Sequence, residues 1–254
     1  ADAVTRYAFE TLGWPHLYLN NALANVASAR IKARQGAIEI RREPMIYVAG
    51  PDDRQVWRLT REAWQARRAP VLPPTPVLET ARLVLRPLEA RDAPAIQRLV
   101  GQWEVVRFLL AKTPWPYPAD GAATNMAECL EKRARNEQLF WAITLKGDDE
   151  LVGRIDLRPD AGDHEMRGFW LDPQLAGAGL MTEAAEAVTA YAFEVLSWPH
   201  IWVSNAASNR GSHRIKEKQG FELMAVDRAQ FVFGEDDREL WRLTREAWFA
   251  RKGN

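Results

Sequence analysis

A glycine-rich turn in the second half of the chain is the strongest candidate for chemistry in this sequence. Gly177, Ala178 and Gly179 follow a strand-like stretch at 165–173 and lead into a helix-like stretch at 181–196. Such a turn leaves backbone N–H groups without helical partners, and the helix dipole adds positive potential there. Glycine permits the positive φ angles and the close approach that a phosphate or pyrophosphate needs. A tight connection without a ligand is the alternative.

The turn matches neither of two familiar phosphate-binding loops. No Gly-Lys-Ser or Gly-Lys-Thr follows it, so it is not a Walker loop. No third glycine stands at the spacing of a Rossmann fingerprint either. These two classes of nucleotide site are therefore excluded here.

The elements around the turn mix strands and helices. Alternating and apolar patterns predict strands at 81–88, 139–146, 150–159 and 165–173. Apolar spacing predicts helices at 119–137 and 181–196. A strand, a helix that ends at Gly220 and an antiparallel pair are expected to follow. This order predicts an α/β or α+β sheet protein.

The end of the chain repeats its beginning. A shift of 184 positions aligns 1–69 with 185–253 without a gap, and 36 of the 69 pairs are identical. Position 1 matches position 185, so the glycine turn has no counterpart in the first copy. We therefore expect a partial repeat (1–69), a proline-rich extended linker (70–76) and a complete unit (77–254).

Composition narrows the class of protein. The 254 residues include 47% hydrophobic residues and 11 Trp, enough for a substantial core. Lys plus Arg and Asp plus Glu both total 34, which argues against a nucleic-acid partner. Cys129 is the single cysteine, and no apolar run approaches the ~20 residues of a membrane span. We expect a soluble cytoplasmic protein with no membrane partner and no metal site.

Four stretches of the complete unit follow the pattern of one family. They are "LETARLVLRPLEARDA" (78–93), "GFWLDPQLAGAGLMTEA" (168–184), "NRGSHRIKEKQGFE" (209–222) and "WRLTREAW" (241–248). Together they resemble the GNAT superfamily of acyl-CoA N-acyltransferases, in particular its ribosomal-protein N-terminal acetyltransferase branch. The resemblance implies a GNAT-type mixed, mostly antiparallel central sheet flanked by helices, preceded here by a half-GNAT repeat.

The resemblance also implies a co-substrate and its site. Gln174, Gly177 and Gly179 fit the family's pyrophosphate loop, so acetyl-CoA is expected there. Ala176 and Ala178 stand where the family often carries an aromatic and a basic residue, so binding would depend on backbone amides. The full set expected to hold acetyl-CoA is Trp170, Leu171, Gln174, Leu175, Ala176, Gly177, Ala178, Gly179, Leu180 and Asn209.

Two residues are candidates for protonating the departing thiolate and for hydrogen-bonding the CoA arm. Ser212 matches the family position from which a hydroxyl can protonate the thiolate. Asn209 matches the residue that hydrogen-bonds the CoA arm. Ser28 and Asn25 occupy the same positions in the copy without the loop, so helix capping is an open alternative for both.

A general base is needed to deprotonate the attacking amine. Glu165, at the start of the strand that enters the turn, is our first candidate, with a solvated carboxylate as the alternative. His164, His213 and Asp156 are further candidates. Backbone N–H groups near Trp170 are expected to stabilise the oxyanion.

These features predict an N-acyltransferase that moves an acetyl group from acetyl-CoA to a primary amine by direct attack. The amine is a protein N-terminus or a small molecule, and a catalytically silent acyl-CoA-binding or assembly module is the alternative function. The partial repeat lacks the partner strands of its own half-sheet, so we expect it to dock in cis or in trans, as a homo-oligomer or by strand exchange. The large apolar residues expected to need cover are Tyr7, Phe9, Trp14, Trp57 and Trp64.

Overall fold

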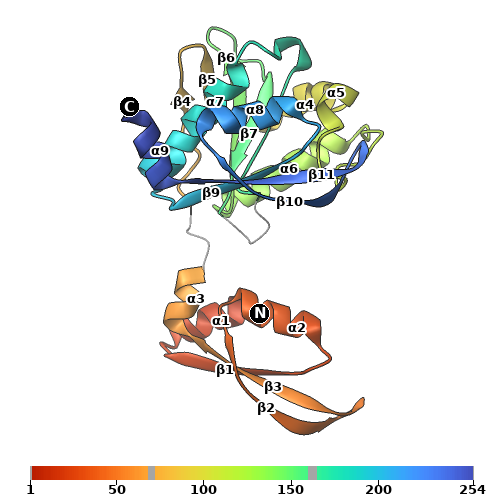
Figure 1. Ribbon diagram of the computed structural model, residues 1–254, viewed down its shortest axis with the longest axis vertical. Coiled ribbons are helices and arrows are strands. Elements are labelled where there is room, and N and C mark those ends of the chain that lie inside the picture. Colours follow the sequence, from red (N-terminus) through yellow and green to blue (C-terminus); the bar gives the residue numbers. More distant parts are fainter. Residues whose placement is uncertain (1, 68–71, 160–164, 254) are drawn as a thin grey trace. The chain divides into compact units, whose positions relative to one another are not determined.

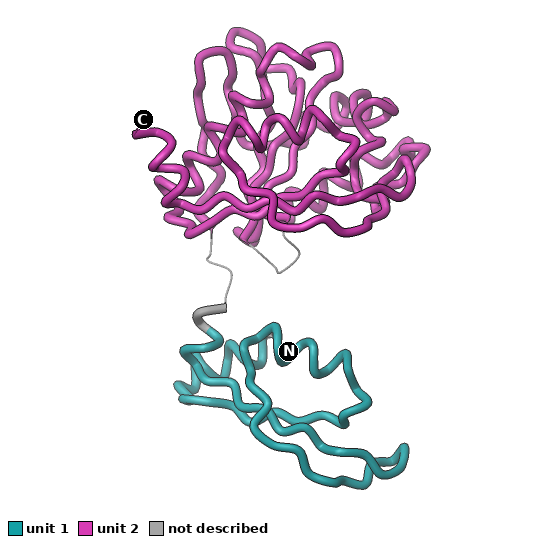
Figure 2. Tube along the Cα trace, in the orientation of Figure 1, with its two compact units in different colours: residues 1–69 teal, residues 70–254 magenta. Residues whose placement is uncertain are grey.

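The protein is described by a computed structural model that covers residues 2–67, 72–159 and 165–253. The chain divides into two compact units, unit 1 (residues 1–69) and unit 2 (residues 70–254), coloured separately in Figure 2. Each unit has its own sheet and its own apolar core.

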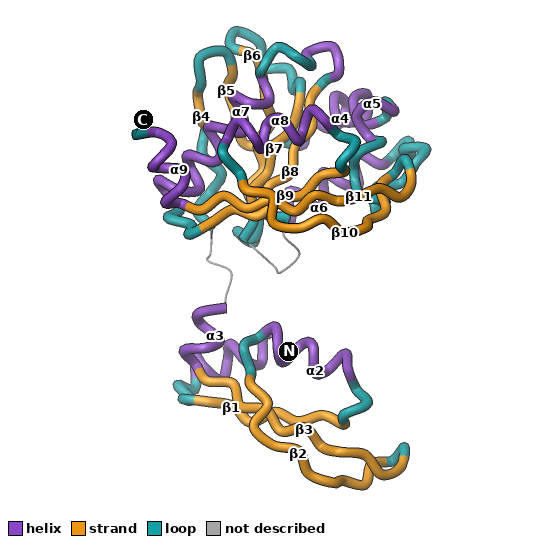
Figure 3. Tube along the Cα trace, in the orientation of Figure 1, coloured by secondary structure: helices purple, strands orange, loops and turns teal. Residues whose placement is uncertain are grey.

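Unit 2 contains a five-stranded sheet that is antiparallel throughout. Its strands, in spatial order, are β4 (Leu78–Glu79), β5 (Leu83–Pro87), β6 (Leu139–Leu145), β7 (Gly153–Leu157) and β8 (Arg167–Leu171). Alternate side chains of β6 face opposite sides, because successive residues of a strand point in opposite directions. Trp141 joins one buried cluster and Phe140 the other, so the sheet is covered on both faces (Figure 3).

A second sheet of three strands completes unit 2. Its order is β10 (Glu222–Phe231), β11 (Gly234–Thr244) and β9 (His200–Ala206), all antiparallel. One backbone hydrogen bond between described residues joins the edges of β8 and β9, from Met166 N to Trp202 O at 3.0 Å. Beyond that bond the two edges belong to separate sheets, so the central sheet is interrupted between β8 and β9.

Helices cover the two faces of the five-stranded sheet, as Figure 1 shows. One core cluster takes residues from α7 (Leu180–Ala190), its π-helical continuation Tyr191–Val195, α8 (Arg210–Gln219) and α9 (Arg245–Lys252). The other takes residues from α4 (Ala93–Val100), α5 (Trp103–Val106) and α6 (Gly121–Ala134). Short 3-10 turns lie at Ala90–Asp92 and Pro173–Leu175.

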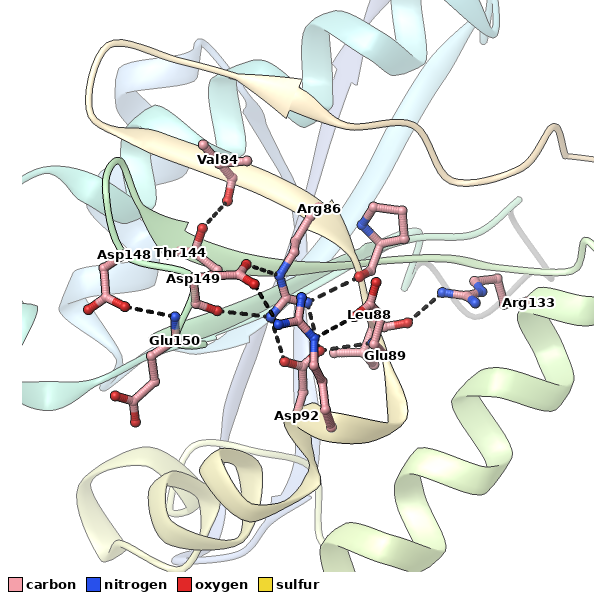
Figure 4. A network of polar contacts seen from close by, with 12 residues as sticks. Val84, Arg86, Leu88, Glu89, Asp92, Arg133, Thr144, Asp148, Asp149 and Glu150 are labelled. Carbon is pink, nitrogen blue, oxygen red and sulfur yellow. Dashed lines mark hydrogen bonds and ion pairs between the residues drawn. The ribbon is translucent and has the colours of Figure 1, made fainter.

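A buried ion pair fixes the end of β5 to the start of α4 (Figure 4). Arg86 donates to both carboxylate oxygens of Asp92, at 2.9 and 2.7 Å, and its Nε donates to Asp149 Oδ1 at 2.6 Å. The hydrogen bond to Asp92 is the main reason that the pKa of Arg86 is raised. This network connects β5, α4 and the β6–β7 hairpin, and removal of one partner from such a pair typically costs ~3–5 kcal/mol.

Unit 1 contains the helices α1 (Asp2–Arg6), α2 (Val26–Arg34) and α3 (Arg61–Arg67), and the strands β1 (His16–Ala22), β2 (Ile38–Tyr47) and β3 (Gly50–Thr60). The strand order is β1-β3-β2, antiparallel. β3 and β11 start at 50 and 234 and end at 60 and 244, an offset of 184 at both ends. Irregularities in register between Glu39 and Arg41 and between Leu223 and Ala225 keep the same offset.

The predicted α+β class is confirmed: unit 2 combines antiparallel sheets with flanking helices, as its structural neighbours do. The single central sheet of the expectation is divided into two sheets of five and three strands. The hairpin around Gly147 is the β6–β7 pair, and the helix expected at 181–196 is α7 with its π-helical end. The short strand β4 and the helix α5 were not predicted, because pieces this short carry little periodicity. In the described parts of the chain, no helix has the length and apolar character of a membrane span.

The expectation for the large apolar residues of unit 1 was partly wrong. Phe9, Trp57 and Trp64 are buried in the unit's own core, where Phe9 and Trp64 lie 5.2 Å apart between ring centroids. Tyr7 and Trp14 are exposed. The three-stranded sheet of unit 1 therefore covers part of its apolar surface with the π-helical segment Tyr7–Thr11, which carries Phe9, and with α3, which carries Trp64.

Candidate active site

The glycine turn has the backbone conformation that its sequence predicts. Gly177 has φ +82° and Gly179 has φ +79°, both in the left-handed region that glycine adopts without strain. Gly179 is the N-cap of α7. Asp172 caps the preceding 3-10 turn by accepting from Gln174 N at 2.9 Å. The chain thus turns sharply after β8. The backbone N–H groups of the first turn of α7 point toward the N-terminal end of that helix.

A row of backbone amides at this turn has no hydrogen-bond acceptor among the described residues. It runs over residues 177–182, and the first amide of α7 to find a helical acceptor is that of Glu183, which donates to Gly179 O at 3.1 Å. Residues 176–179 are exposed. Open amides at a helix N-terminus bind anions, because the helix dipole and the N–H groups point at the same spot.

Two side chains that the sequence analysis missed hold this turn in place. Arg82 Nη1 donates to Ala178 O at 2.9 Å, and Arg82 Nε donates to Glu183 Oε2 at 2.7 Å. Thr80 Oγ1 donates to Glu183 Oε1 at 2.6 Å. Burial raises the pKa of the Glu183 carboxyl, but the hydrogen bonds from Thr80 and Arg82 outweigh it and lower that pKa overall. Arg82 lies 101 positions before Glu183, a separation that no local spacing rule covers.

Asn209 and Ser212 lie at the start of α8. Asn209 is the N-cap, and its Oδ1 accepts from Ser212 N at 3.1 Å. The Ser212 hydroxyl is not the capping group: its Oγ accepts from Lys216 Nζ at 2.7 Å. Both Ser212 and Lys216 are buried. Asn209 Oδ1 is therefore the capping group of α8. The Ser212 hydroxyl is hydrogen-bonded to Lys216 instead.

Glu165 lies at the junction of β8 and β9, and its carboxylate affects the pKa of Lys216. Its carboxylate accepts a hydrogen bond from Ser204 on β9. Burial is the main cause that lowers the pKa of Lys216 to about 7, with Arg167 adding to the effect. The carboxylates of Glu165 and Glu239 act in the opposite direction. The structure thus places Ser212 within hydrogen-bond distance of a buried ammonium whose pKa the carboxylate of Glu165, distant in sequence, also affects.

The other residues named from sequence lie in varied surroundings. Trp170 is buried against the α4–α6 side of the sheet, where the guanidinium of Arg154 lies 6.0 Å from its ring centroid. Any role of Trp170 in the site would therefore come from its backbone. Leu171 and Leu175 are half-buried, Gln174 is exposed and Leu180 is buried.

The alternative bases are also accounted for, apart from His164, which lies outside the described residues. His213 Nδ1 lies 2.9 Å from Glu239 Oε2, so its ring is turned toward β11. Asp156 is buried and accepts from Gln138 Nε2 at 2.7 Å. Burial raises the pKa of the Asp156 carboxyl, although Arg154 and Gln138 act against that. The described residues contain no group of His, Cys, Asp and Glu that could hold a metal ion.

Sequence comparison assigns the larger unit to a known family. A family model for the acetyltransferase (GNAT) domain matches residues 82–222. Probable N-acetyltransferase YjcK of Bacillus subtilis (strain 168) is 29% identical over 157 residues, covering 60% of this chain and 87% of that protein. Uncharacterized N-acetyltransferase YoaA of the same organism is 27% identical over 160 residues, covering 62% and 89%.

Solved structures show the same fold. Ribosomal-protein-S5-alanine acetyltransferase from Vibrio fischeri has a TM-score of 0.58 and 15% identity, covering 68% of this chain and 98% of that one. Mycobacterium smegmatis RimJ in complex with CoA-disulfide has a TM-score of 0.56 and 17% identity, covering 67% and 89%.

The family match, together with relatives named as N-acetyltransferases, defines an acetyl-CoA-dependent N-acetyltransferase. The chain belongs to the GNAT acetyltransferase family. Acetyl-CoA is accordingly its co-substrate.

Proposed function

We propose that unit 2 transfers an acetyl group from acetyl-CoA to a primary amine, with the pyrophosphate of CoA bound at residues 177–182. The observation that carries this proposal is the row of unpaired amides at the N-terminus of α7. Ala176 and Ala178 have no side-chain group that could bind an anion. The row of amides can bind one without such a group. Arg82 holds the Ala178 carbonyl, which keeps the peptide planes of the turn from rotating.

The interrupted sheet supplies the second part of the site. The edges of β8 and β9 separate after the Met166–Trp202 bond, and an extended ligand can pair with open strand edges through main-chain hydrogen bonds. We assign the pantetheine arm to this gap between the edges. The backbone at Trp170 and Leu171 then provides the oxyanion donors, and the Nδ2 of Asn209 is available to the arm because only its Oδ1 caps α8.

Two side chains carry proton transfer in this proposal. Glu165 accepts a proton from the attacking ammonium, directly or through water, and Ser212 gives a proton to the departing thiolate. Two observations support these roles: Glu165 is hydrogen-bonded to Ser204 on β9, one of the strands that border the gap, and Ser212 is hydrogen-bonded to Lys216, whose pKa is affected by Glu165.

Thiol release tests the proposal. The full chain is mixed with acetyl-CoA and a panel of amines that includes peptides with free N-termini, polyamines and aminoglycosides, and free CoA thiol is followed with a disulfide reagent. Amine-dependent thiol release is expected with at least one class. Binding of one CoA per chain without turnover on any class would instead support a catalytically silent acyl-CoA-binding module.

For unit 1 we propose self-association, with unit 1 as a partial GNAT repeat that serves assembly. Identical residues of the two copies differ sharply in exposure: Val4 is 73% exposed and Val188 is 0%, and Trp14 is 50% exposed and Trp198 is 5%. In unit 2 these side chains belong to the large core cluster that includes β5 to β8. The described residues of unit 1 contain no strands equivalent to β5–β8. Leaving a large apolar side chain in water costs ~1.5–3 kcal/mol.

A charged substitution on this face tests the assembly role. Val4→Lys in the full chain is expected to weaken association, seen as a lower average mass in sedimentation velocity. Ile46→Lys is the matched control, because Ile46 is also largely exposed, at 83%, but lies on β2 away from the face equivalent to the core of unit 2. A wild-type chain that is monomeric at all concentrations, with no difference between the two variants, would refute this role.

A further inference from the structure

A buried lysine is hydrogen-bonded to Ser212, and the proposed reaction gives it no task. Lys216 is 1% exposed, and Ser212 Oγ, 2.7 Å from its Nζ, is its hydrogen-bond acceptor among the described residues. Its ammonium also lies 5.9 Å from the centroid of the Phe169 ring on β8, the strand that borders the gap between the sheets. A charge this deeply buried is costly unless it is compensated.

We propose that Lys216 positions the Ser212 hydroxyl as a proton donor and replaces the proton that the hydroxyl gives away. This inference rests on the proposed acetyl transfer. In the balanced step, the amine nitrogen, already deprotonated once through Glu165, bonds to the thioester carbon and loses its second proton to water through the same carboxylate. The carbon–sulfur bond breaks with its electron pair on sulfur. The Ser212 proton goes to sulfur, and a Lys216 proton goes to Ser212 Oγ.

The hydrogen-bond chemistry of the two groups gives the step its direction. An ammonium has three donors and no acceptor, so it must donate to Ser212 Oγ and leaves the hydroxyl hydrogen free to point at another atom. A neutral amine has a lone pair and can accept that hydrogen, which turns it away from the thiolate. The protonated form of Lys216 is therefore the competent one.

The charges that face Lys216 set the pH at which the two forms exchange. They are the carboxylate of Glu165 just before β8, the guanidinium of Arg167 on β8 and the carboxylate of Glu239 on β11. Burial and Arg167 outweigh the two carboxylates, and the pKa of Lys216 falls to about 7. The exchange therefore lies near neutral pH, where a lysine in water would stay charged.

A matched pair exists within the same chain. Lys32 Nζ donates to Ser28 Oγ at 2.6 Å on α2, in the unit that lacks the glycine turn. The Ser–Lys pair therefore also has a packing role in both copies, and Lys32→Met measures that role alone. Lys216→Met measures packing together with any part in proton transfer.

The test compares kcat, and KM for acetyl-CoA, in the full chain for wild type, Lys32→Met, Lys216→Met, Ser212→Ala and the double variant of 212 and 216. Lys216→Met is expected to lower kcat at pH 6 by about 10-fold to 100-fold, with KM within about threefold. Lys32→Met should leave both unchanged. Because Lys216 acts through Ser212, its substitution should add nothing in the Ser212→Ala background.

The pH dependence of one ratio, the kcat of Lys216→Met over the kcat of wild type, separates proton transfer from packing. A packing role alone would leave that ratio the same at every pH. Dividing the kcat of Lys216→Met by that of wild type cancels the ionisation of the acceptor amine and of the base. The ratio should rise toward one as the pH passes about 7. Should the methionine variant fail to fold, Lys216→Arg replaces it, and its ratio to wild type should rise above pH 7 because arginine stays protonated.

The outcomes separate the two proposals. Turnover by wild type with a pH-independent ratio, or with additive losses in the double variant, overturns the role of Lys216 alone. Absence of turnover on every amine class overturns the proposed function and this inference with it.

Discussion

Replacing Gly177 by valine separates ligand binding at the turn from its role as a connection. Gly177 has φ +82°, and a Cβ built on it meets nothing within 4 Å. Valine held in that conformation costs ~1–3 kcal/mol of backbone strain. For a unit of this size the melting temperature should fall by roughly 2–12 °C. The fold is expected to survive, because no clash accompanies the strain.

The effect on CoA should be far larger. The added side chain stands in the exposed space beside the amides of residues 177–182. A hydrogen bond to a charged group contributes ~1.5–3 kcal/mol. Loss of two such bonds to the pyrophosphate lowers the affinity for CoA by roughly 10²-fold to 10⁴-fold.

Calorimetric titration with CoA and steady-state rates measure this. Gly147→Val is the matched control: Gly147 has φ +89° with nothing within 4 Å, and it lies in the β6–β7 hairpin, so it adds the same strain away from the turn. Acetyl-S-pantetheine, which lacks the pyrophosphate, should be used with equal kcat/KM by wild type and by Gly177→Val. If the affinity of Gly177→Val for CoA stays within about threefold of that of Gly147→Val, the turn is only a connection.

Three further predictions concern single side chains. Ser212→Ala should lower kcat by roughly 10²-fold or more while the Kd of CoA changes little, and Ser28→Ala should leave both unchanged; a loss in kcat under about threefold would return Ser212 to a packing role. The pKa of Lys216 is about 7 when folded and 10.5 in the unfolded chain, so its burial costs stability in full below pH 7 and less as the pH rises toward 10.5. Lys216→Met should therefore raise the free energy of unfolding by about 2–5 kcal/mol at pH 6 and much less at pH 10, and urea titrations showing an equal gain at both would contradict this. The folded pKa of Asp156 is raised, so its charge costs stability above that pKa and nothing below the unfolded value of 3.8; Asp156→Asn should stabilise the fold at pH 7 and lose that advantage in thermal melts at pH 3.

The sequence was most informative where structure is local. The 3.6-residue and 2-residue periods predicted α7 and the β6–β7 hairpin, because each element buries one regular set of side chains. The positive φ angles of Gly177 and Gly179 followed from glycine in a strand-to-helix turn. These features depend on residues a few positions apart.

The contacts that complete the site depend on residues far apart in the chain. Arg82 holds the turn from the start of β5, and nothing in its local sequence points to α7. The burial of Lys216 could have been predicted: α8 buries Ser212, Ile215, Lys216 and Gln219, the spacing of an apolar face, although three of these are polar. A lysine is normally assigned to solvent, so the sequence indicated a solvated charge or a contact with CoA phosphates instead.

Calorimetric titration of the full chain with CoA tests the central claim most directly. The claim is that one amide-lined turn, at residues 177–182, holds the co-substrate, and that unit 1 has no equivalent site. We predict one binding site per chain, and its loss in Gly177→Val. Two equivalent sites per chain, or an unchanged isotherm in that variant, would contradict the account.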